Sequence, residues 1–86
     1  MKVVVPSQLR DYTAGASQVE ARGASLAALL ADLDQRYPGI RFRMVDEQES
    51  IRRHIKIFVN REQVRRLDAP LAERDEIVIV GALSGG

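Results

Sequence analysis

Cysteine is absent from this chain of 86 residues, and histidine occurs only once, as His54. Without cysteine the chain forms no disulfide, binds no metal through thiolates and has no thiol nucleophile. A single histidine does not make a metal site alone, and no obvious nucleophile accompanies it for general-base catalysis. The sequence therefore predicts no metal site and no catalytic role for His54.

An excess of charge of one sign is also lacking. Thirteen Lys and Arg residues face twelve Asp and Glu residues, which leaves a formal net charge of +1. This balance cannot produce the broad positive field of a general nucleic-acid binder, so we expect no nucleic-acid partner. The acidic trio Asp46, Glu47 and Glu49 has arginines nearby, which favours surface ion pairs over a cation site.

Long apolar runs are missing as well. No stretch approaches the ~20 residues that span a bilayer, and the start, MKVVVPSQLRDY, has no run typical of a signal peptide. We therefore expect a soluble, cytoplasmic protein without a membrane partner. The length suits one domain, which has too few residues to enclose a deep active site. This favours a binding or carrier role over a catalytic one.

Five segments have the composition or alternation of β-strands. In the clearest one, Ile55, Ile57 and Val59 alternate with polar or outward residues, and Ile77 and Ile79 do the same in the last. Such alternation predicts that these five side chains face a core. The expected strands cover residues 1–5, 18–22, 54–60, 63–65 and 76–80.

One segment has the period of a helix. Its apolar face consists of four leucines, and Ser25 before them is a plausible N-cap, while Pro38 and Gly39 end the helix. Residues 7–16 are expected to be a loop, and residues 40–53 a long charged connection with at most a short helix. The leucines are Leu26, Leu29, Leu30 and Leu33.

The order of these elements predicts an α+β fold in which a mixed sheet of four to five strands packs on one helix. We expect residues 1–80 to form this domain and residues 81–86, GALSGG, to form a flexible tail. Six residues reach roughly 20 Å when extended. Gly85 and Gly86 lack Cβ atoms and can enter a passage too narrow for other residues.

This arrangement is typical of a chain that delivers its C-terminus to a partner's pocket. The alternative is a frayed terminus without a role. Two terminal glycines arise by chance in about 0.5% of chains, which makes the alternative the weaker one.

Several segments resemble the MoaD/ThiS sulfur carriers, prokaryotic relatives of ubiquitin with a β-grasp fold. The resemblance covers nearly the whole chain and is strongest to carriers of the CysO type used in cysteine biosynthesis. Only the tail is a specific motif. The matching segments, beside the order of elements, are residues 57–60 (IFVN), 64–65 (VR), 74–77 (RDEI) and 82–86 (ALSGG).

The resemblance implies that an E1-like enzyme uses ATP and Mg to adenylate the carboxylate of Gly86, which a sulfur donor converts to a thiocarboxylate. Leu83, Ser84 and Gly85 would carry this group into the partner. The chain itself would bind no cofactor and would be a protein cosubstrate. Its partners would be the activating enzyme, a sulfur-accepting enzyme and, for the cysteine branch, a metalloprotease that releases the product.

The same resemblance places the first and last strands side by side, with the third strand next to the last. By alternation Val4, Phe58, Val78 and Val80 then face outward and form an apolar patch. We predict that the activating enzyme docks there, with Leu83 as a further anchor. The alternative is that the long connection or the tail covers part of the patch.

Other functions stay open at this point. The chain could be the small subunit of a molybdopterin synthase, a modifier that forms isopeptide bonds to lysines as ubiquitin does, or an interaction module whose tail has no role. The acceptor of the sulfur, thiamin, cysteine or another metabolite, is not specified by the sequence.

Overall fold

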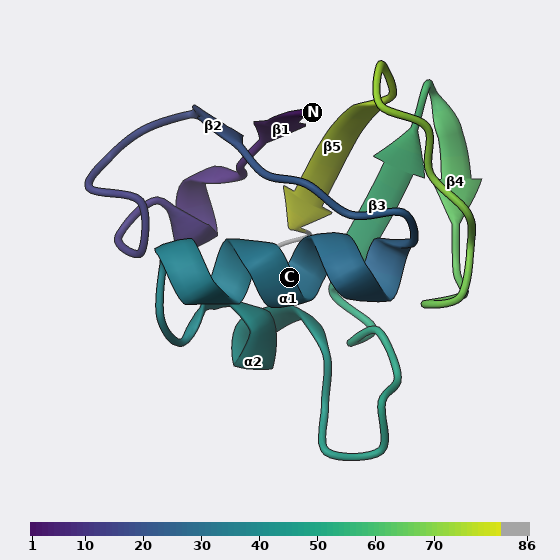
Figure 1. The fold of residues 1–86 in the computed structure, drawn as a ribbon. Coiled ribbons are helices and arrows are strands. Elements are labelled where there is room, and N and C mark those ends of the chain that lie inside the picture. The colour runs from purple at the N-terminus through teal and green to yellow at the C-terminus, as the bar shows by residue number, and fades with distance from the viewer. Residues whose placement is uncertain (82–86) are drawn as a thin grey trace.

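The computed structural model describes residues 1–81. All five predicted strands and the predicted helix are present, with ends that differ from the prediction by at most two residues (Figure 1). In chain order the elements are β1 (Lys2–Val4), the 3-10 helix η1 (Ser7–Leu9), β2 (Gln18–Glu20), α1 (Leu26–Arg36), α2 (Ile40–Met44), β3 (Ile55–Val59), β4 (Glu62–Val64) and β5 (Glu76–Gly81).

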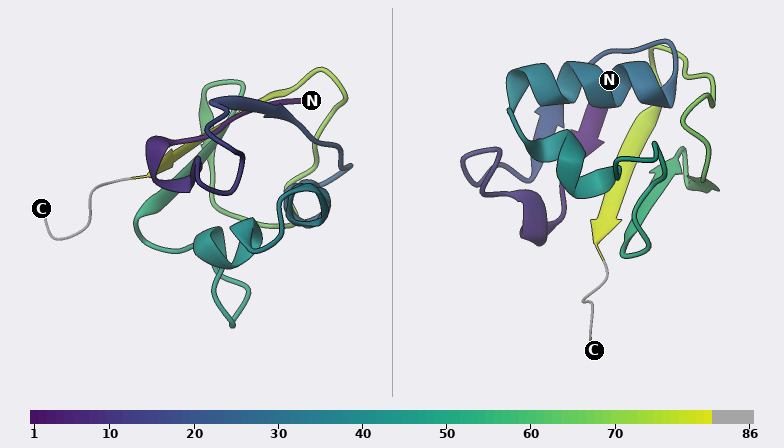
Figure 2. Two further views of the ribbon diagram at one scale, coloured as in Figure 1. Left: turned by 90° about the vertical axis from the view of Figure 1, so that its left-hand side faces the viewer. Right: turned by 90° about the horizontal axis from the view of Figure 1, so that it is seen from below.

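The strands form one mixed sheet in the order β2-β1-β5-β3-β4. β1 and β5 are parallel, and the other neighbouring strands are antiparallel. The first and last strands of the chain therefore lie together at the centre of the sheet, as predicted. α1 crosses one face of the sheet, and no helix of residues 1–81 covers the opposite face (Figures 1 and 2).

The leucine face of α1 joins the sheet to the helix. All four predicted leucines are buried, and they pack with inward residues of the three central strands, such as Val3, Ile57 and Ile77. Ser25 is the N-cap, as predicted, because its side chain accepts a hydrogen bond of 3.2 Å from the N–H of Ala28. Each fully buried leucine stabilises the fold by roughly 2 kcal/mol.

The connection after α1 contributes more to the core than its charged sequence indicates. It contains α2, and Ile40, Met44 and Val45 are fully buried. Ile40 and Met44 are four residues apart and so share one helical face, whereas Arg41 and Arg43 lie between them. A helix of five residues is too short to show this period in the sequence.

Two smaller predictions need correction. Residues 7–16 contain η1, whose Leu9 is buried, so this segment is not only a loop. Val59 is half-buried rather than fully buried, because it lies at the end of β3 beside the exposed turn. Among residues 1–81 no helix is long and apolar enough to cross a bilayer.

Candidate functional site

The tail residues on which the sequence prediction rests, Leu83, Ser84, Gly85 and Gly86, lie outside the described residues. The division into a domain of residues 1–80 and a tail stays a prediction. β5 continues one residue further than predicted, through Gly81. The described part of the site is therefore the base of the tail and the surfaces around it.

Gly81, the last residue of β5, is held from both sides. On one side it is the ladder partner of Ile55 in β3. On the other side the Gln8 Nε2 donates a hydrogen bond of 2.8 Å to its carbonyl oxygen. Sequence reasoning missed Gln8, because 73 residues separate it from Gly81 and no local pattern links the two.

The predicted apolar patch lies on the face of the sheet opposite α1. Val78 in β5 is directly opposite Val4 in β1 and Phe58 in β3, so these three side chains form one row across the central strands. Val80 is 41% exposed, whereas the other three are half-buried. The structure thus brings all four predicted residues onto one face, although three are less exposed than the alternation indicates.

Polar side chains surround this row. Gln18 in β2 is the partner of Val4, and Gln63 in β4 is the partner of Phe58, so an amide closes each end. An ion pair of 3.7 Å between Lys2 and Glu76 lies on the same face, two residues before Val4 and Val78 along their strands. An apolar centre with a polar rim is the composition of many protein interfaces.

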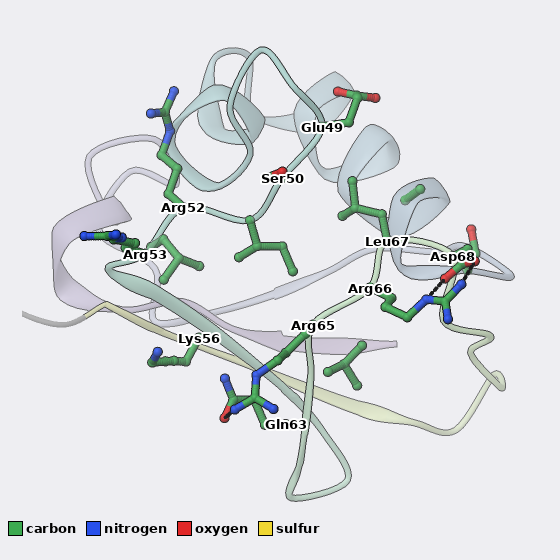
Figure 3. Close-up of a pocket in the computed structure, with 15 residues that line it drawn as sticks. Glu49, Ser50, Arg52, Arg53, Lys56, Gln63, Arg65, Arg66, Leu67 and Asp68 are labelled. Carbon is green, nitrogen blue, oxygen red and sulfur yellow. Dashed lines mark hydrogen bonds and ion pairs between the residues drawn. The ribbon is translucent and has the colours of Figure 1, made fainter.

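A groove with a basic lining lies beside the base of the tail, because Ile55 lines it and also pairs with Gly81. Its volume is about 820 Å³, and Ile51, Val64 and Leu67 provide further apolar lining. Figure 3 shows Lys56, Gln63 and Arg65 together at one end of the groove. Its charged lining residues are Glu49, Arg52, Arg53, Lys56, Arg65, Arg66 and Asp68.

The two acids of the groove already have partners. Glu49 pairs with Arg41 at 3.0 Å, which confirms an ion pair in the acidic segment, and Asp68 pairs with Arg66 at 2.7 Å. The hydrogen bonds from Arg66 lower the pKa of the Asp68 carboxyl. Within residues 1–81, Arg53, Lys56 and Arg65 form no ion pair. The groove therefore presents positive charge to a partner.

The segments IFVN and RDEI, which carried part of the family resemblance, meet in the structure. The side chain of Asn60 donates to Asp75 Oδ1 at 2.8 Å and accepts from the N–H of Glu76 at 2.9 Å. A hydrogen bond from the N–H of Ala72 and the one from Asn60 lower the pKa of Asp75. Asn60 and Arg61 have positive φ angles, as a tight turn after β3 requires. These contacts connect the turn after β3 to the start of β5.

His54 is exposed and lies directly before β3. Arg65, Arg66 and Arg74 are also exposed. The first two line the groove, whereas Arg74 lies elsewhere.

A five-stranded mixed sheet around one main helix, with parallel first and last strands at its centre, is the ubiquitin-like β-grasp fold. The chain belongs to the ThiS family, whose model matches residues 3–86. It is 36% identical to the sulfur carrier protein CysO of Mycobacterium tuberculosis over 89 aligned residues, which cover 98% of this chain and 96% of that protein.

Solved structures agree with this assignment. The crystal structure of the Amycolatopsis orientalis BexX/CysO complex matches with a TM-score of 0.91 and 38% identity, covering 99% of this chain and 98% of the other. The small archaeal modifier protein 1 of Methanosarcina acetivorans matches with a TM-score of 0.79 and 28% identity, covering 99% and 94%.

Proposed function

We propose that this protein is a sulfur carrier whose reactive group is the α-carboxylate of Gly86. The observation that carries the proposal is the family match, which extends to Gly86, together with 36% identity to the carrier CysO over almost the whole chain. The protein acts as a cosubstrate and not as an enzyme. ATP and Mg belong to the E1-like partner that activates it.

The chemistry has two steps. The Gly86 carboxylate attacks the α-phosphate of ATP, pyrophosphate leaves, and an acyl-adenylate forms. A sulfur donor then attacks the acyl carbon and displaces AMP, which leaves a thiocarboxylate. Because the chain contains no cysteine, it cannot carry the sulfur as a persulfide, so the sulfur is held at the chain end.

The activating enzyme docks on the apolar patch of Val4, Phe58, Val78 and Val80, with Leu83 as an additional anchor. The patch supports this role because it joins an apolar row to a polar rim on the sheet face opposite α1. β5 runs through this patch and leads directly to the tail. A partner that covers the patch is therefore placed to receive the chain that follows Gly81.

The sulfur acceptor belongs to cysteine biosynthesis in this proposal, with a metalloprotease that releases the product. The high similarity to CysO supports this branch. The A. orientalis structure contains CysO in a complex with BexX, so a protein of this fold forms such a complex.

The test is mass spectrometry of the protein purified from its native host. A thiocarboxylate adds the mass difference between sulfur and oxygen, and tandem spectra must place it at Gly86, because oxidation of Met1 or Met44 adds nearly the same mass. The same reaction is run in vitro with the cognate activating enzyme, ATP and sulfide. A plain carboxylate under all these conditions, or a gain that persists after deletion of Gly86, contradicts the proposal.

A second function is favoured by the likeness to the small archaeal modifier protein 1. A modifier forms an isopeptide bond between its terminal carboxylate and a lysine. It appears in cell extracts as conjugates of higher mass that disappear when Gly86 is deleted. If cell extracts contain the thiocarboxylate form of the protein but no such conjugates, the modifier function is excluded and the sulfur-carrier function is retained.

A further inference from the structure

In the described part of the chain, one edge of β5 has no strand beside it near its C-terminal end. The pairing of β1 with β5 ends at Val4, opposite Val78, whereas β5 continues to Gly81 and still pairs there with Ile55 of β3. After Val4 the chain continues its pairing with β2 for one residue, since the N–H of Val5 bonds to the carbonyl of Ser17 at 2.8 Å. It then enters η1, whose N-cap is Pro6, and proline has no N–H to donate to β5. Among residues 1–81, the end of β5 thus has a strand on one side only.

η1 lies next to this uncovered edge (Figure 2). Its Gln8 donates through Nε2 to the carbonyl of Gly81 at 2.8 Å, which is the bond that a continued β1 would provide through its backbone. A Cβ built on Gly81 would lie 2.9 Å from Gln8 Oε1 and 3.0 Å from Gln8 Cδ. The amide therefore occupies the space that any other side chain at position 81 would need.

The turn that carries Gln8 is well fixed. Leu9 is buried in the core, and its N–H bonds to the carbonyl of Pro6 at 3.0 Å. Arg10 adds a bond of 3.1 Å from Nε to the carbonyl of Val5. Gln8 thus extends from an anchored base, although its own side chain is exposed.

We propose that Gln8 is a positioning residue for the tail: its amide replaces the missing strand partner at Gly81 and fixes the point from which the tail leaves the domain. The proposal rests on the carrier function above. With the base of the tail fixed before docking, the activating enzyme orders fewer residues when it binds. Loss of one neutral hydrogen bond of this kind predicts a fall in kcat/KM of about 3- to 10-fold.

The first test is the kinetics of activation by the cognate E1-like enzyme. Gln8→Ala removes the amide, and Gln8→Glu keeps its shape but loses the donor. Both are expected to raise KM about 3- to 10-fold with kcat nearly unchanged. Gln35→Ala, the same change at an exposed position of α1, is the matched control and leaves KM unchanged. The thermal midpoint of each variant checks that the fold is intact.

A double-mutant cycle tests the contact itself. In Gly81→Ala the new methyl group displaces the Gln8 amide, so KM rises as in Gln8→Ala. In the Gln8→Ala background the methyl group displaces nothing, and Gly81→Ala adds little. Fully additive effects of the two substitutions overturn the proposal.

A measurement without the enzyme separates this proposal from the carrier function. The NMR order parameter of the Gly81 amide reports motion on the ps–ns timescale. It is expected to fall in Gln8→Ala and Gln8→Glu and to stay constant in Gln35→Ala. If the enzyme activates neither the parent nor any variant, the carrier function is contradicted. The NMR measurement still shows whether the hydrogen bond from Gln8 restrains Gly81. An unchanged order parameter, or a lowered one without any change in KM, overturns the role of Gln8.

Discussion

Gly23 precedes α1 at a point where the backbone of the chain touches the backbone of the helix. A Cβ added at Gly23 would lie 2.3 Å from the backbone nitrogen of Leu29 and 2.7 Å from the carbonyl carbon of Ala28. Ordinary contacts between such atoms are about 3.5 Å or longer. In Gly23→Ala, either α1 or the segment before it must therefore move by about 1 Å.

This shift affects the core, because Leu29 and Leu30 are fully buried beneath the contact. A gap of about 1 Å removes up to half of the dispersion energy at each separated contact. We expect Gly23→Ala to lower the free energy of unfolding by about 3 kcal/mol, the upper part of the usual range for an overpacked site. The total for a domain of this size is only about 5–10 kcal/mol.

Urea denaturation measures this loss, and Gly15→Ala provides the matched control. Gly15 has a φ of +87° and no atom within 4 Å of the added Cβ, so its substitution isolates the backbone strain of about 1–2 kcal/mol. Gly23 has no positive φ, so its substitution isolates the steric contact. A loss below about 1 kcal/mol in Gly23→Ala would refute the reasoning.

Three further predictions concern the surface. Val80→Asp places a charge in the proposed docking patch and is expected to raise KM for the activating enzyme about 10-fold or more at an unchanged thermal midpoint; an unchanged KM contradicts docking there. Reversing two of the unpaired charges of the groove in Lys56→Glu plus Arg65→Glu is expected to weaken activation and flatten its dependence on salt, whereas Arg74→Glu, outside the groove, does neither. Asp75 has a lowered pKa in the folded state, so its bonds stabilise the fold above the unfolded value of about 3.9 and are lost as the pH falls through the folded value. The free energy of unfolding, measured by urea titration, should therefore fall less steeply below about pH 4 in Asp75→Asn than in the parent, and equal slopes would argue against this role.

The parts of the fold that could be predicted depend on local periodicity. The leucines of α1 repeat over about two turns, and β3 alternates over five residues, so each pattern is long enough to identify its element. Ile40 and Met44 belong to a helix with little more than one turn, and the arginines between them hide their common face. Short elements acquire their structure from the core on which they pack.

The residues of the candidate site likewise include some that local patterns predict and some that they do not. The sequence predicted the outward row of Val4, Phe58 and Val78 because alternation within each strand fixes the face, and the family resemblance supplied the order of strands. Gln8 and the pair of Asn60 with Asp75 are contacts between distant segments. Their formation depends on how the strands are assembled, which no local pattern records.

The central position of β5 affects the biosynthesis of the protein. β1 and β2 leave the ribosome early and β3 and β4 later, but these two pairs join into one sheet only through β5, the last element of residues 1–81. Domains fold as units during synthesis, so the sheet is completed only after residue 81 has emerged. A nascent chain that stops before β5 therefore lacks Val78 and Val80 of the apolar patch and also Gly81, so it lacks part of the surface on which we propose that the activating enzyme docks.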